Sequence, residues 1–315
     1  MSSLSVSPKL VRVMQVMILL LLSALLWKAA DGQGAVRLIQ DANLSWLALA
    51  VLVLTLQTVI SAQRWRITAE RIGLDLSAME ALREYYLAQV VNQTLPGGII
   101  GDAGRVVRAR HRAGLLVSGQ AVVFERVAGQ MGLLAVLVFG LVFSLVIATG
   151  FIWPEWLGDY ALSLFWISAL IPLLVLGTLK IMGPRADAIR RFVSSFRHAV
   201  LARDVVLQQS AMSLGTALCN VAAFALCAAA IGLSLPLVVS ITLVPLILFS
   251  MLIPLSVGGW GIREGAAALV FPVFGATASQ GLATSVAFGL VFLVTVLPGL
   301  FVIWLRPNAP VLGHH

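Results

Sequence analysis

The most informative charged residues in the sequence are Arg263 and Glu264, which are adjacent and interrupt a long apolar stretch. From Val205 to Leu305 no other side chain is Asp, Glu, Lys or Arg. A charged side chain inside a membrane span costs about 2.5–3.5 kcal/mol on insertion scales, and it is functional by default. Because the planar guanidinium of Arg263 matches phosphate or carboxylate, we expect the pair to bind an anionic group. The alternative is a structural pair that neutralises itself and fixes the segment.

A second set of polar residues surrounds a glycine-rich break in the first half of the chain. Its candidate binding residues, all charged or amide side chains near that break, are Asn92, Asp102, Arg105, Glu125 and Arg126. We expect the carboxylates to orient the arginines, or to titrate if protons drive a reaction. Two alternatives remain open. Glu125 and Arg126 form a pair that snorkels to the membrane interface, or Asn92 bonds to a neighbouring helix.

Both sets lie beside a break in an apolar segment. The first break is Pro96-Gly97-Gly98, and the second runs from Pro254 to Gly258-Gly259. Broken backbone in hydrocarbon exposes polar groups at several kcal/mol each, so it occurs only within protein or beside water. Where a helix restarts, its free N–H groups and dipole favour an anion, and glycine allows close approach. We therefore expect these four glycines to line the site.

These residues must be positioned by membrane-spanning helices. Of the 315 residues, 60 % are apolar and 11 % are charged, and the mean hydropathy is +1.01, whereas a soluble domain has roughly 25 % charged residues. This composition excludes a soluble globular enzyme and predicts an all-α, polytopic integral membrane protein. About six full spans of the required ~20 residues are predicted over 11–29, 42–62, 127–152, 160–179, 205–231 and 279–305.

The two broken segments, 85–104 and 237–275, are predicted to be broken or re-entrant hairpins. The second is also long enough for two full crossings. Residues 1–155 and 156–306 then each contain two spans, a hairpin and a final span, which predicts an inverted repeat; 307–315 is a tail with a tag remnant. Matching Gly/Pro-interrupted segments in two halves indicate a transporter binding site. The alternative is that Gly and Pro are simply common in membrane helices.

The loop charges predict the orientation of the chain. Lys and Arg gather in 63–83, 105–126 and 180–204, whereas 153–159 contains only acidic charges. Cytoplasmic loops collect Lys and Arg, so we expect a bacterial inner-membrane protein with both termini cytoplasmic. The net charge of +8 follows the same rule and does not indicate nucleic acid. The arginines between Arg105 and Arg112 form a solvated loop or capture an anionic headgroup.

No motif for a cofactor or metal is found in the sequence. It contains no Walker A loop, HExxH, GxSxG or Cys/His metal spacing, so no cofactor and no metal are expected. Cys219 and Cys227 lie in an uncharged stretch and are expected to pack as small apolar side chains.

The two breaks together resemble a known family. Asn92-Gln-Thr-Leu-Pro-Gly-Gly-Ile-Ile-Gly-Asp-Ala-Gly-Arg105, the pair Glu125-Arg126, and Pro254-Leu-Ser-Val-Gly-Gly-Trp-Gly-Ile-Arg-Glu-Gly265 are similar to motifs of the lysylphosphatidylglycerol synthase transmembrane, or flippase-like, domain family. The resemblance covers about residues 10–305. It implies lipid translocation, with standalone members associated with hopanoids, glycolipids or polyisoprenyl-phosphate carriers.

We therefore expect a lipid translocase that moves an anionic or headgroup-modified lipid between leaflets. The sequence lacks the aminoacyl-transferase domain of the full synthases, so the resemblance does not imply local lipid synthesis. One alternative is a membrane-embedded enzyme acting on a lipid headgroup, for which Asp102 and Glu264 are the candidates. Another is a non-transporting partner of a lipid-modifying enzyme. The lipid species, direction, driving force and oligomeric state do not follow from the sequence.

Overall fold

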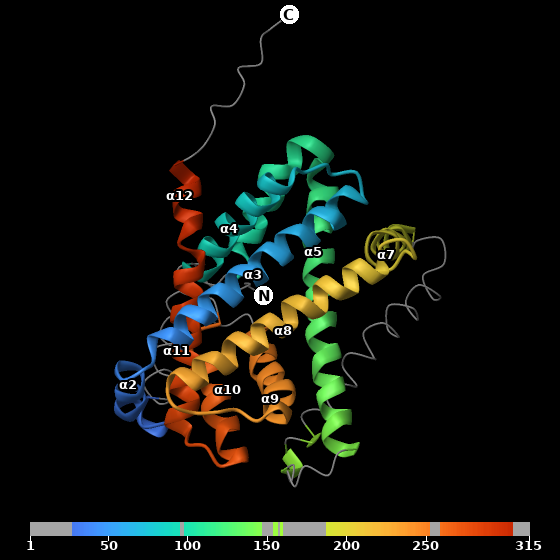
Figure 1. Cartoon of the computed structure of the whole chain (residues 1–315). Coiled ribbons are helices and arrows are strands. Elements are labelled where there is room, and N and C mark those ends of the chain that lie inside the picture. The colour runs from blue at the N-terminus through green and yellow to red at the C-terminus, as the bar shows by residue number, and fades with distance from the viewer. Residues whose placement is uncertain are drawn as a thin grey trace, which may run out of the picture.

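The computed structural model describes residues 27–94, 98–146, 154–156, 158–159, 187–252 and 259–304. Every regular element in these ranges is helical, which confirms the all-α class (Figure 1). The elements are α2 (Gly32–Gln40), α3 (Leu44–Glu70), α4 (Ala78–Thr94), α5 (Ile100–Val146), α7 (Asp187–Val200), α8 (Val206–Ala230), α9 (Leu237–Phe249), η2 (Ser250–Leu252), α10 (Ile262–Val270), η3 (Phe271–Phe274), α11 (Ala278–Val296) and α12 (Pro298–Trp304).

Within the described ranges, four segments are long and apolar enough to cross a membrane. They are Leu44–Glu70, Ile100–Ser144, Val206–Ala230 and Ala278–Phe301, and they coincide with the predicted spans 42–62, 127–152, 205–231 and 279–305. The predicted span 160–179, and 11–29 apart from its last three residues, lie outside the described residues. The total of six full spans therefore stays a prediction.

The helix that contains the third predicted span begins well before residue 127. α5 already begins at Ile100, and Gly114 interrupts it with φ 80° and ψ 165°. Only glycine adopts this conformation without strain, so Gly114 divides α5 into a short leg before it and a long span after it. The charged pair Glu125-Arg126 lies within the helix and does not mark its start; Glu125 is buried and pairs with Arg64.

The first predicted hairpin, 85–104, is present as two antiparallel helices with longer legs than expected. Successive contacts join α4 to the first leg of α5: the Asn92 side chain accepts from the Gly101 N–H at 2.7 Å, and Arg108 pairs with Glu84 at 2.5 Å. A Cβ on Gly101 would lie 2.0 Å from the Ala88 carbonyl oxygen, so this glycine permits the close approach. The turn falls between Thr94 and Ile100, where the sequence predicted it.

The second broken segment also consists of two short helices. α9 has 13 residues and α10 has 9, and both are shorter than the ~20 residues that a full crossing needs. Gly259 and Gly261, just before α10, have φ of 87°, a conformation that favours glycine. The described legs of this segment therefore fit a broken hairpin better than two full crossings.

The centre of the molecule is the contact between α3 and α8 (Figure 1). The two helices are antiparallel, because the Asn43 N–H donates to the Ala230 carbonyl at one end and Gln209 donates to Thr68 at the other. α3 and α8 are the second spans of the two predicted halves, and an inverted repeat requires such equivalent spans to be antiparallel. The repeat itself stays a prediction.

Candidate functional site

Five charged residues of the first half form one connected group, which we call the arginine cluster: Arg64, Asp102, Arg105, Glu125 and Arg126. Arg64 pairs with Glu125 at 2.7 Å, and Arg105 pairs with Asp102 at 2.5 Å and approaches Glu125 at 3.5 Å. Arg126 pairs with Asp102. The cluster therefore joins α3 to both parts of α5.

The arginine cluster has more positive than negative charge. Three guanidinium groups against two carboxylates leave one formal positive charge. The four buried residues, Arg64, Asp102, Arg105 and Glu125, balance one another, so this excess lies on the half-exposed Arg126. A buried charge is costly unless it is paired and hydrogen-bonded. The Nε of Arg64 and the Nε and Nη1 of Arg105 have no hydrogen-bond partner. The cluster therefore has both the charge and the free donors to receive an anion.

Aromatic side chains hold Arg105 in place. Its Cζ lies 4.6 Å from the ring centre of Trp65 and 4.7 Å from that of Tyr85, which is cation–π distance. The Tyr85 hydroxyl also donates to Glu125 at 3.2 Å. Arg105 is 1 % exposed, so it acts as a fixed positive charge behind the pocket described next.

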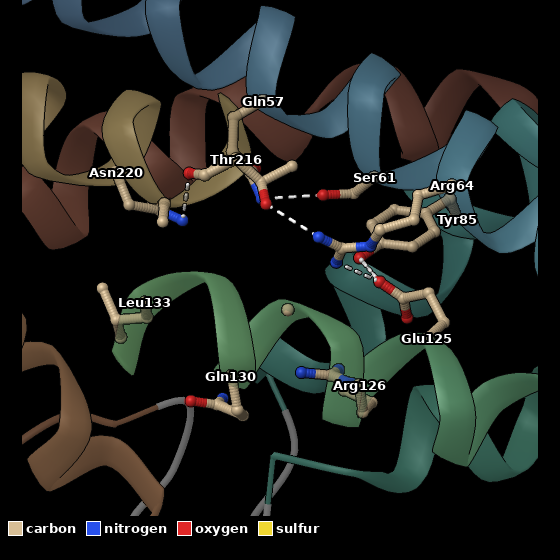
Figure 2. Close-up of a pocket in the computed structure, with 12 residues that line it drawn as sticks. Gln57, Ser61, Arg64, Tyr85, Glu125, Arg126, Gln130, Leu133, Thr216 and Asn220 are labelled. Carbon is tan, nitrogen blue, oxygen red and sulfur yellow. Dashed lines mark hydrogen bonds and ion pairs between the residues drawn. The ribbon is translucent and has the colours of Figure 1, made fainter. Parts of the chain in front are cut away.

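A pocket of about 140 Å³ lies beside the cluster, between α3, α5 and α8 (Figure 2). Its polar lining consists of Gln57, Ser61, Arg64, Tyr85, Glu125, Arg126, Gln130, Thr216 and Asn220. A cavity of about 150 Å³ holds a molecule the size of benzene, so this pocket has room for one small group, such as a phosphoryl group. Arg126 is at its exposed side, with a side chain 47 % exposed, whereas Arg64 lies inside.

The pocket lining follows from the periodicity of two helices. Gln57, Ser61, Arg64 and Thr68 are spaced by 4, 3 and 4 residues on α3, and Gln209, Ser213, Thr216 and Asn220 repeat the same spacing on α8. This spacing places each set on one helix face. The two faces meet, since Arg64 donates to Thr216 at 2.8 Å and Gln209 donates to Thr68 at 3.0 Å. A polar seam therefore runs between two apolar helices.

Two local features of α5 shape the cluster. Asp102 lies in the first turn of α5, where the helix dipole favours a negative charge. Gly129 leaves room for the Arg64 guanidinium, because a Cβ there would lie 2.8 Å from Nη2 of Arg64.

Arg263 and Glu264 lie in a separate group with Ser285. We call these three residues the paired site. Arg263 pairs with Glu264 at 2.6 Å, and its Nε donates to the Ser285 hydroxyl at 2.9 Å. Glu264 also accepts from the Gly261 N–H at 2.6 Å. Both charged residues are buried, and neither lines the pocket. In the described residues no hydrogen bond or ion pair joins this site to the arginine cluster.

The structure brings some of the predicted site residues together and not others. Asp102, Arg105, Glu125 and Arg126 share one cluster, whereas Arg263 and Glu264 contact each other and α11. Asn92 bonds to the backbone at Gly101 and not to the pocket. Gly98 and Gly259 have positive φ of 62° and 87°, whereas Gly97 and Gly258 lie outside the described residues.

Arg64 is the main residue that the sequence analysis placed wrongly. It was expected in a cytoplasmic loop over 63–83, but α3 continues to Glu70 and buries Arg64 to 3 % exposure. Its burial is possible because Thr216 and Glu125 accept hydrogen bonds from its Nη1 and Nη2. The pocket residues Gln57, Ser61, Gln130, Thr216 and Asn220 were missed as well. The repeated spacing of polar residues in spans 42–62 and 205–231 was the available signal.

A comparison with known families decides the assignment. The model of a family described as "Lysylphosphatidylglycerol synthase TM region" matches residues 12–299. The chain belongs to this family. This match confirms the resemblance to the lysylphosphatidylglycerol (LPG) synthase transmembrane family. Members of the family are membrane-associated and lipid-related, which agrees with the apolar helices of this chain. Comparisons with curated proteins and with solved structures gave no match.

No metal centre is evident among the described residues. They contain no group of three or more His, Cys, Asp or Glu side chains that would hold a metal ion. The polar lining of the pocket combines guanidinium, amide and hydroxyl groups with the carboxylate of Glu125.

Proposed function

We propose that this LPG synthase TM protein translocates a lipid with an anionic headgroup between the leaflets of the bacterial inner membrane. The observation that supports this most is the unbalanced positive charge of the arginine cluster beside a polar pocket. The four buried residues of the cluster balance one another, so the excess charge lies on the half-exposed Arg126, where an anion beside hydrocarbon would be bound. The headgroup would enter the pocket while the acyl or prenyl tail stays in lipid.

Arg126 is the residue that we propose to bind the headgroup first. One of its Nη atoms pairs with Asp102, and its half-exposed side chain leaves other N–H groups of the guanidinium available. Arg64 would complete the anion site from inside the pocket. The amides of Gln57, Gln130 and Asn220 would bind hydroxyl or amide groups of the headgroup, because an amide both donates and accepts.

The polar seam between α3 and α8 supports movement of the headgroup across the membrane. It extends from Thr68 and Gln209 near one end of these helices to Gln57 and Asn220 nearer their middle. We propose that the halves rock against each other about this antiparallel contact, as in other transporters with inverted repeats. The side of entry is the end of α3 with Arg64, which we propose to face the cytoplasm, as both termini do.

The proposal includes no chemical change of the lipid. Asp102 and Glu264, the candidates for catalysis, are both engaged in ion pairs with arginines. We propose that a lipid is the substrate and that any lipid-modifying enzyme is a separate partner.

The test is lipid movement in vesicles that contain only the purified protein. Fluorescent lipids with matched acyl chains and either anionic or zwitterionic headgroups are placed in both leaflets, and a membrane-impermeant reductant reports those that reach the outer leaflet. We expect the protein to move the anionic lipid, and Arg126→Gln to abolish this while Arg37→Gln, a matched exposed arginine on α2, does not. Lack of movement by the wild-type protein, or a chemically altered lipid, would overturn the proposal.

A further inference from the structure

α7 is a strongly amphipathic helix that the sequence analysis treated as a loop. Its apolar residues Ile189, Phe192, Val193 and Phe196 recur at spacings of 3, 1 and 3 residues, which places them on one face. Arg190, Arg191, Arg197 and His198 occupy the rest of the surface and are exposed. A helix with this pattern packs its apolar face on protein or lies in the plane of a membrane interface.

The position of α7 in the molecule agrees with such a role. Figure 1 shows α7 almost end-on, while α5 and α8 lie across the view, so its axis is steeply inclined to both. Phe192 and Phe196 contact the ring of Phe124 at centroid distances of 5.1 and 5.3 Å. α7 is thus attached to α5 by its apolar face and leaves its cationic face free.

The exposed side of α7 combines unpaired cations with apolar groups. Asp187 lies near Arg190 and Asp204 pairs with Arg71, but within the described part of the chain Arg191 and Arg197, and Arg203 just after α7, have no carboxylate at ion-pair distance. Phe192, and Leu201 directly after the helix, are 39 % and 43 % exposed. A leaflet of anionic lipid offers phosphates to the arginines and hydrocarbon to the exposed apolar side chains. An acidic protein surface would complement only the arginines.

From these observations we infer that α7 docks on the anionic lipid surface of the leaflet beside it, and that this docking holds the pocket wall in place. The second part rests on the proposed function. Phe124, which α7 contacts, directly precedes Glu125 and Arg126 in α5. A docked α7 therefore restrains the turn of α5 that presents both residues to the pocket, and the lipid composition of the leaflet would regulate transport.

The docking is tested without any transport assay. Hydrogen exchange of the full chain is measured in nanodiscs of phosphatidylcholine alone and of phosphatidylcholine mixed with phosphatidylserine. We expect slower exchange over 187–200 and over 120–130 in the anionic discs, and loss of this difference at high salt. In Arg191→Gln/Arg197→Gln the affinity for the anionic surface should fall roughly 30-fold, so the difference should disappear.

A matched control removes two exposed positive charges at the other end of α8. Lys28→Gln/Arg37→Gln should keep the full response to phosphatidylserine, because α2 packs near Ile231 and not near α7. Equal exchange of α7 in both lipids, or an unchanged response in the α7 variant, would overturn the docking. Slower exchange of 187–200 without any change over 120–130 would overturn its effect on the pocket. Neither result depends on whether the protein moves lipid.

Discussion

The arginine cluster of the first half holds three guanidinium groups and two carboxylates, whereas the paired site of the second half holds one of each. In the paired site, Arg263 and Glu264 bond to each other, to Ser285 and to the backbone of Gly261. In the arginine cluster, several guanidinium N–H groups have no partner and a pocket lies alongside. Two breaks of similar sequence thus differ in what they leave available for a ligand.

This difference separates a structural ion pair from a binding site. The neutral pair joins α10 to α11 through bonds from Nε and Nη2 of Arg263, and it carries no excess charge that would attract an anion. The arginine cluster has an excess positive charge on the half-exposed Arg126, which is available to an anion. We therefore propose Arg126 and Arg64 as the principal ligands of the headgroup, and Arg263 as a positioning residue for the second broken hairpin.

The largest expected effect is that of Glu125→Ala. The substitution leaves Asp102 as the one carboxylate for the three arginines of the cluster, while Arg64 and Arg105 stay buried. Breaking a buried ion pair costs about 3–5 kcal/mol. The free energy of unfolding in detergent should fall by that amount. An unchanged unfolding midpoint would show that water already compensates these arginines.

The paired site should respond differently to single and double substitution. Glu264→Leu alone leaves Arg263 buried and unpaired, at a cost of about 3–5 kcal/mol, whereas replacing both partners of a buried pair by apolar groups is often neutral. We expect Arg263→Leu/Glu264→Leu to be close to wild type in stability, apart from about 1 kcal/mol for the lost cap at Gly261, and to retain lipid movement. Loss of lipid movement in a stable double variant would make Arg263 a ligand after all.

A smaller effect is expected for Gly129→Ala. The added Cβ would lie 2.8 Å from Nη2 of Arg64, and because this is the end of a flexible side chain, the arginine can shift at little cost in stability. Arg64 would move within the pocket, so the transport rate should fall several-fold with an unchanged melting temperature. Gly119→Ala is the control, since its Cβ meets only Val106, at 3.9 Å. Equal transport rates for the two variants would exclude a role for the position of Arg64.

The smallest effect concerns Glu80 and Arg112, which join the two legs of the first hairpin outside the pocket. The hydrogen bond from Arg112 lowers the pKa of Glu80 from 4.5 to about 2. Because the folded-state pKa is the lower one, this pair stabilises the protein above pH 4.5, and the effect is lost as the pH falls toward 2. Both side chains are about half exposed, so Glu80→Gln should cost at most about 1 kcal/mol at neutral pH. Unfolding curves of both proteins should converge in acid, and a constant difference would exclude ionisation as the cause.

Sequence patterns were sufficient to predict the four apolar spans that the described residues contain and the positions of the two breaks between helices. Hydropathy and the Gly/Pro positions depend on local composition, so they could be interpreted residue by residue. The burial of Arg64 could not, because it depends on Glu125 and Thr216, which are distant in the sequence and close only in the fold. Likewise, the contact of Arg263 with Ser285 could not be read from the sequence, because Ser285 lies on a later helix; the role of Arg263 in binding stays a prediction.

The most direct test of the central claim is to measure which lipids the purified full chain retains. Native mass spectrometry compares binding of anionic and zwitterionic lipids with identical acyl chains to the wild-type protein, to Arg126→Gln and to Arg263→Leu/Glu264→Leu. The account predicts a preference for the anionic lipid that Arg126→Gln loses and the double variant keeps. A preference that survives Arg126→Gln and disappears in the double variant would contradict it.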